Sequence, residues 1–120
     1  MKKGGLNMET FVMLTSLSSR SIYSPKSLET LGKRVMERIR SECSEVEWVH
    51  NLAVLGPYDY LDIFRAPDTQ TAFKVSTIVR SFGHAHTEVW NATEWAKFKD
   101  LIRNLKQFFS HHEQDSTQST

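Results

Sequence analysis

The stretch "VEWVHNLAVLGPYDYLDIF", residues 46–64, decides the fold. Its two halves are rich in β-branched, aromatic and other apolar residues, and Gly56-Pro57 separates them. A glycine-containing break between two strand-like segments predicts a β-hairpin. Because an amphipathic helix is predicted on each side of this hairpin, its strands become the middle pair of a β-α-β-β-α-β order.

Both helices have recognisable ends and an apolar stripe. Ser24 caps the first helix and Pro25 begins it, whereas Asp68 caps the second helix and Gly83 ends it. Apolar residues follow at helical spacing: Leu28, Leu31, Val35, Ile39 and Cys43 in the first helix, and Ala72, Val75, Val79 and Phe82 in the second. Both helices should therefore pack one face against a sheet.

Strands are predicted for "TFVMLTSL", residues 10–17, and for "GHAHTEVWNA", residues 83–92. An additional C-terminal helix carries Trp95, Phe98, Ile102, Leu105 and Phe109 on one stripe, and we expect it to dock on its own sheet or on a partner. The predicted fold is α+β and ferredoxin-like, with an antiparallel four-stranded sheet of order 4-1-3-2 and two helices on one face. We expect a flexible N-terminus over residues 1–8, a domain over 9–110 and a disordered polar tail over 111–120.

One layer of helices leaves the other sheet face open. If Leu61 and Ile63 point toward the helices, the third strand shows Tyr58, Tyr60, Asp62 and Phe64 on the open face. In the fourth strand, inward Ala85 and Val89 leave His84, His86, Glu88 and Trp90 on that same face. Because the first strand is apolar on both faces, this open surface is too apolar to stay in water, and we predict a homodimer through it.

Polar groups on this face form the predicted site. The candidate ligand-binding residues are Tyr58, Tyr60, Asp62, His84, His86 and Glu88, and the candidate catalytic residues are His84, His86, Glu88 and Asp62. One hypothesis is a module that binds a small molecule in this cleft. The alternative is an enzyme in which a histidine acts as a general base beside a carboxylate. A third interpretation is polar packing at a strand or dimer edge.

Two histidines on one strand also raise the question of a metal. His84 and His86 lie about 6.8 Å apart along a strand, within reach of one ion, with Glu88 or Asp62 as a third ligand. No fourth well-spaced ligand is evident, so we predict neither a metal nor another cofactor. The register of the hairpin decides which sheet face carries His50, so the sequence gives no prediction for the face of this residue.

Composition narrows the functional class. Fifteen basic and fourteen acidic residues leave a net charge of +1, which does not indicate a nucleic-acid partner. No apolar run approaches the roughly 20 residues of a membrane helix. The single cysteine, Cys43, continues the apolar stripe of the first helix, which favours a thiol buried in the core. One cysteine cannot form an internal disulfide, which favours a cytoplasmic location.

The segment "LGPYDYLDIFRAPD", residues 55–68, resembles the signature of GYD-domain proteins, and the resemblance extends to "GHAHTEVWNATEW", residues 83–95. The matching positions are Gly56, Tyr58, Asp59, Pro67, Asp68, Gly83 and Thr87. The resemblance covers roughly residues 9–100, implies a fold of the dimeric α/β-barrel type and implies no mechanism. Turn geometry alone can explain Gly56, Tyr58 and Asp59, while a ligand role for Tyr58 or Asp59 is the alternative.

Overall fold

The computed structural model describes residues 7–18, 24–83 and 85–105. The elements are β1 (Glu9–Leu17), α1 (Pro25–Glu42), β2 (Glu47–Ala53), β3 (Tyr60–Ala66), α2 (Thr69–Gly83), β4 (Ala85–Ala92) and α3 (Trp95–Asn104). This order confirms the predicted β-α-β-β-α-β arrangement with a further helix. The predicted segments 1–8 and 111–120 fall largely or wholly outside the described residues, so those boundaries stay predictions.

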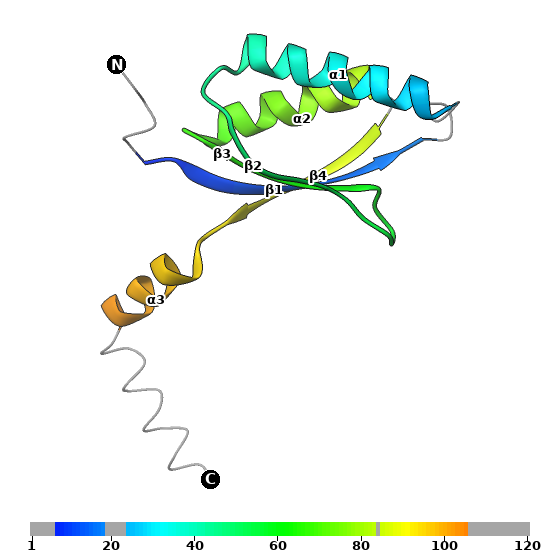
Figure 1. Ribbon diagram of the computed structural model, residues 1–120. Coiled ribbons are helices and arrows are strands. Elements are labelled where there is room, and N and C mark those ends of the chain that lie inside the picture. Colours follow the sequence, from blue (N-terminus) through cyan, green and yellow to red (C-terminus); the bar gives the residue numbers. More distant parts are fainter. Residues whose placement is uncertain (1–6, 19–23, 84, 106–120) are drawn as a thin grey trace.

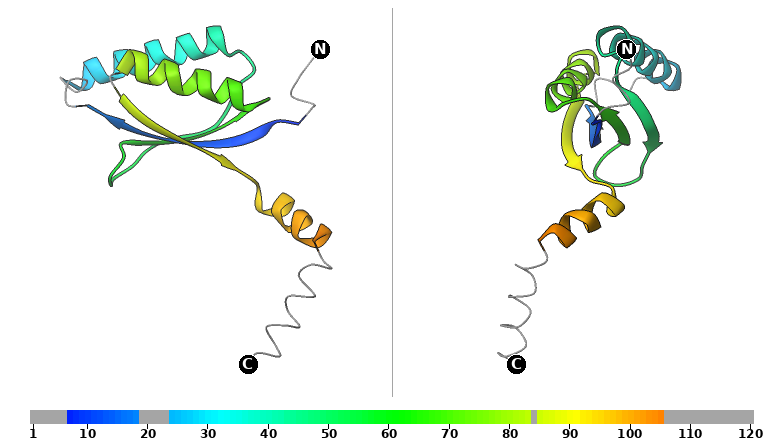
Figure 2. Two further views of the ribbon diagram at one scale, coloured as in Figure 1. Left: turned by 180° about the vertical axis from the view of Figure 1, so that it is seen from behind. Right: turned by 90° about the vertical axis from the view of Figure 1, so that its left-hand side faces the viewer.

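The four strands form one sheet in the order β2-β3-β1-β4, and every neighbouring pair is antiparallel. This is the predicted order 4-1-3-2 read from the other edge. Both α1 and α2 cover the same sheet face and leave the second face open (Figures 1 and 2). The prediction of a single helical layer is therefore confirmed.

Local hydrogen bonds fix the start of both helices where the sequence predicts them. The Ser24 hydroxyl accepts a hydrogen bond from the amide of Ser27 at 3.1 Å, and Pro25 begins α1. The Asp68 carboxylate accepts from both the amide and the hydroxyl of Thr71, at 2.8 and 2.7 Å. Each cap satisfies an amide that has no partner within its helix.

The core lies between the sheet and the two helices. Phe64 of β3 is fully buried, with ring centroids 5.5 Å from Phe11 of β1 and 5.3 Å from Trp48 of β2. Ile39 and Cys43 pack against this cluster from α1 and its end. Burial raises the pKa of the Cys43 thiol, which is the behaviour of a structural core thiol rather than a reactive one.

The predicted orientation of β3 is wrong. Phe64, Asp62 and Tyr60 face the helices, and Leu61 and Ile63 lie on the open face. Both sets of alternate residues in this strand include large apolar side chains, so alternation does not choose between the faces. The pairing with β1 does choose, because Phe64 lies opposite the buried Phe11 and shares its face.

Helix α3 leads away from the sheet (Figures 1 and 2). Its stripe is exposed, with Trp95 at 67%, and none of its described residues is buried. An ion pair of 2.6 Å between Arg65 of β3 and Glu94 holds its beginning. Docking on its own sheet is not found for the described part of α3, whereas Phe109 lies outside that part.

No helix in the described part of the chain is both long enough and apolar enough to cross a membrane.

Candidate functional site

The structure divides the predicted site between the two sheet faces. His86 and Glu88 lie on the open face, as predicted, because they pair with Ser16 and Leu14 of β1 while Thr87 between them points to α2. Tyr60 and Asp62 lie on the helix-covered face. The predicted common cleft, with its histidine beside Asp62, is therefore wrong. His84 lies outside the described residues.

Tyr58 joins the open-face group. Its hydroxyl donates a 2.5 Å hydrogen bond to the Glu88 carboxylate, across the central strand β1. This hydrogen bond, with smaller contributions from burial and from the charge of Glu88, raises the pKa of Tyr58. Tyr58 and Glu88 are thus partners of each other, and they tie the hairpin to β4.

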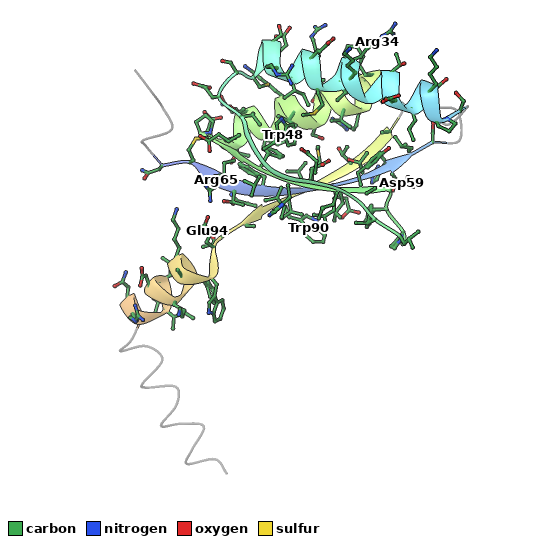
Figure 3. All side chains as sticks on the ribbon, viewed as in Figure 1. Arg34, Trp48, Asp59, Arg65, Trp90 and Glu94 are labelled. Carbon is green, nitrogen blue, oxygen red and sulfur yellow. The ribbon has the colours of Figure 1, made fainter. Side chains whose placement is uncertain are left out.

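The remaining family-motif residues shape the hairpin end. Gly56 has a φ of 151°, which favours glycine because a side chain would be strained there. The Asp59 carboxylate accepts a 2.7 Å hydrogen bond from the amide of Leu17, and the Asp59 amide donates to the Thr15 carbonyl at 2.8 Å. These contacts join the hairpin to the end of β1 and support the structural interpretation of Gly56 and Asp59. The figure with side chains shows Asp59 at this end of the sheet (Figure 3).

A cavity of about 380 Å³ lies between α1 and the helix-covered face of the sheet. Its walls are mainly apolar: Met13, Leu17, Leu28, Leu31, Gly32, Val35, Met36, Ile39, Trp48, Val79 and Ala85. The polar residues on its sheet side are Thr15, Asn51, Tyr60 and Asp62, and those on α1 are Glu29 and Lys33. An apolar cavity with a few converging polar groups is the usual form of a small-molecule site.

Asp62 is the acidic group on the sheet side of this cavity. Burial raises the pKa of its carboxyl group, and a 2.9 Å hydrogen bond from the Asn51 side-chain amide partly opposes that shift. Burial, followed by the charges of Asp59 and Asp62, also raises the pKa of Tyr60. Perturbed titratable groups beside a cavity are typical of functional sites.

Sequence reasoning selected Tyr60 and Asp62 but missed Asn51 and Thr15. A β-bulge between Trp48 and His50 shifts the register of β2, which places Asn51 opposite Asp62 and His50 opposite Ile63. Asn51 therefore faces the cavity and His50 faces the open side. An alternating pattern cannot reveal such a bulge, because the extra residue interrupts the period of two.

Within the described ranges, no three His, Cys, Asp or Glu side chains are grouped so that they could hold a metal ion. His84 is not among the residues searched, so the expectation of no metal at this strand stays a prediction.

Comparison with protein families matches residues 11–102 to the GYD domain. The chain belongs to the GYD-domain family. Thr87, one of the positions that carries the resemblance, holds β4 against α2, because its hydroxyl lies 2.6 Å from that of Ser76. The family assignment therefore agrees with the fold built from these residues.

One relative of this GYD-domain protein is the glutamine synthetase and cystathionine beta-lyase binding protein of Thermus thermophilus. It is 33% identical over 105 residues, which cover 82% of this chain and all of the relative. Two solved structures are also similar. The hypothetical protein ORF119 from Sulfolobus islandicus rod-shaped virus 1 has a TM-score of 0.48 and 11% identity, covering 86% of this chain and 84% of that one. A nipsnap family protein from Agrobacterium tumefaciens has a TM-score of 0.45 and 13% identity, and the match covers 74% of this chain and 91% of that one.

Proposed function

We propose that this GYD-domain protein is a cytoplasmic homodimer that binds a small, mainly apolar molecule beneath α1 in each protomer. The observation that carries the ligand site is the cavity of about 380 Å³, where apolar walls surround Thr15, Asn51, Tyr60 and Asp62. Its volume falls within the range of about 300–1,000 Å³ that is usual for ligand sites. The buried, free Cys43 supports the cytoplasmic location, since a reducing compartment preserves a thiol.

The open sheet face supports the dimer. Val12, Leu61 and Ile63 are half-buried at its apolar centre, around the buried Leu14, and Trp90 beside them is 53% exposed. Contiguous apolar surfaces of this kind usually mark an interface. A second copy is a suitable occupant, because a two-fold axis brings the same patch of each protomer together. The ligand cavity lies on the opposite face of the sheet and stays accessible in such a dimer.

Blocking the cavity should abolish binding of an apolar probe. A Cβ atom added at Gly32 meets no atom within 4 Å, and Gly32 lines the cavity, so we expect Gly32→Phe to be accommodated by the backbone and to occupy part of the cavity with its ring. We expect the neutral dye N-phenyl-1-naphthylamine to bind the wild type with a saturable fluorescence increase. Gly32→Phe should weaken this binding by about tenfold or more, which corresponds to a loss of about 1.4 kcal/mol.

Gly32→Ala is the matched control, because a single methyl group leaves most of the cavity free. It should bind the dye as the wild type does. A wild type without saturable binding, or a Gly32→Phe variant that binds normally while folded, would contradict the proposed ligand site.

A second candidate function is the binding of another enzyme. The Thermus relative is named for its binding to glutamine synthetase and cystathionine beta-lyase, and α3 here presents Trp95, Phe98, Leu101 and Leu105 as exposed large apolar side chains. An amphipathic helix with an exposed apolar stripe is suited to a groove on a protein partner. In this second proposal, α3 is the contact surface.

The enzyme-binding proposal predicts that Phe98→Asp weakens binding of purified Thermus glutamine synthetase or cystathionine beta-lyase by about tenfold or more, since a central apolar contact is replaced by a charge. Biolayer interferometry with the immobilised full chain measures this change. Lys99→Asp, which puts the same side chain on an exposed position of the same helix, should change the affinity much less. Failure of the wild type to bind either enzyme, or equal losses in both variants, would contradict the role of the α3 stripe.

A further inference from the structure

Asp62 is the charged residue that the sheet contributes to the cavity beneath α1. The other charged residues lining the cavity, Glu29 and Lys33, belong to exposed positions of α1. Asp62 instead extends from β3 among Met13, Trp48 and the apolar side chains of α1. A ligand in this space therefore faces mainly apolar walls and one carboxyl group at the sheet.

The hydrogen bonds of Asp62 leave room for a further donor. Asn51 donates to Oδ1 at 2.9 Å, and no hydrogen bond among the described residues reaches Oδ2. Within the same residues, no lysine, arginine or histidine lies within ion-pair distance of this carboxyl group. A carboxylate accepts up to about four hydrogen bonds. The Asp62 carboxylate, which lines the cavity, can therefore accept further hydrogen bonds from a ligand there.

The chemistry of these walls discriminates between ligand classes. An anionic ligand would place its charge against Asp62, with like charges in surroundings of low polarity. A purely apolar ligand would fill the cavity and exclude water from the carboxylate without offering a donor in its place. An ammonium group offers three donors and an opposite charge, and Thr15 and Tyr60 provide hydroxyl oxygens on the same wall.

We propose that the cavity binds a small amphipathic amine, with the ammonium group at Asp62 and the hydrocarbon body between α1 and the sheet. This assignment rests on the proposed small-molecule function of the same cavity. It names the class of ligand, a protonated primary amine on an aliphatic or aromatic body. Asp62 is the residue that sets the specificity for the cation.

Binding should depend on pH in a defined direction. Burial raises the pKa of Asp62 because it disfavours the carboxylate, and a bound cation favours that same carboxylate. The amine should therefore bind more weakly as the pH falls through the raised pKa of Asp62 and its carboxyl group takes up a proton. The other titratable groups that line the cavity are Tyr60 from β3 and Glu29 and Lys33 from α1. Substitutions are therefore needed to show that Asp62 causes the pH dependence of binding.

The test compares three probes of equal chain length: hexylammonium, 1-hexanol and hexanoate. Isothermal titration calorimetry and displacement of N-phenyl-1-naphthylamine measure their affinity for the full chain. We expect hexylammonium to bind the wild type about tenfold or more tightly than either other probe at pH 7, an advantage of about 1.4 kcal/mol. Asp62→Asn should remove this preference and its pH dependence, because the amide can still accept from Asn51 but carries no charge. Glu37→Gln, which makes the same kind of change at an exposed position of α1 outside the cavity lining, should retain both.

The outcomes separate the two proposals. If the dye binds but hexanol or hexanoate displaces it as well as hexylammonium does, the amine assignment is wrong and the cavity remains a ligand site. Retained preference in a folded Asp62→Asn variant also overturns the assignment. If neither the dye nor any of the three probes binds saturably, the proposed function fails together with this inference. The pH profile of the wild type provides the test if Asp62→Asn does not fold.

Discussion

Replacing Phe64 by alanine is expected to lower the free energy of unfolding by about 3–5 kcal/mol, the usual cost of removing a large aromatic side chain from a core. Phe64 is fully buried and contacts the rings of Phe11 and Trp48, so the substitution leaves a cavity bounded by three strands. A loss of this size is a large part of the total stability of about 5–15 kcal/mol that is typical of a domain. Urea denaturation followed by circular dichroism measures it.

The control for this experiment is Phe73→Ala on α2. Phe73 is 68% exposed, and its replacement should change the free energy of unfolding by about 0.5 kcal/mol or less. The comparison also tests which face of β3 is in the core. If Phe64→Ala cost no more than Phe73→Ala, the assignment of Phe64 to the helix-covered face would be wrong.

The second large effect is expected at the open sheet face. Trp90→Asp should convert the proposed homodimer into a monomer, because it removes an aromatic anchor and places two like charges near the two-fold axis. We expect the dimer dissociation constant to rise about a hundredfold or more, as for a central interface residue worth about 2–4 kcal/mol. Figure 3 shows Trp90 on the sheet side opposite the helices, where a partner would contact it.

Light scattering after size-exclusion chromatography measures this change. The wild type at micromolar concentration should have twice the 13.9 kDa mass of one chain, and Trp90→Asp should have the mass of one chain. Phe73→Asp makes the same kind of change at an exposed aromatic residue on α2 and should leave the dimer intact. A monomeric wild type, or dissociation by both variants alike, would contradict an interface through the open face.

Some features of the fold depend on residues that are near one another in the sequence, and others depend on contacts between residues that are far apart in it. Helix starts were predictable because each cap is made within three residues, as Ser24 with Ser27 and Asp68 with Thr71 show. The face of β4 was predictable too, because small Ala85 and apolar Val89 alternate with His86, Glu88 and Trp90. These features depend on neighbours in the chain, so a single sequence contains them.

The candidate site was predictable only in part. Tyr60 and Asp62 were chosen as polar residues in a strand, and they do line the cavity, but His86, one of the expected partners, lies on the other face. Asn51, the residue that donates to Asp62, depends on a bulge in β2 that leaves no mark in the alternation of the sequence. The sequence thus identified Tyr60 and Asp62 as candidate residues, but it did not show which other residues would lie beside them.

The sequence by itself determined the order of the elements, the sheet order and the single layer of helices, because hydrophobic period, caps and the Gly56 hairpin act locally. Only the tertiary structure decided which face of β3 is buried, since Tyr60 and Phe64 compete with Leu61 and Ile63 for the core. Pairing with β1 settles that competition by placing Phe64 opposite Phe11. It is the same pairing that turns Asp62 toward α1 and builds the cavity from residues far apart in the chain.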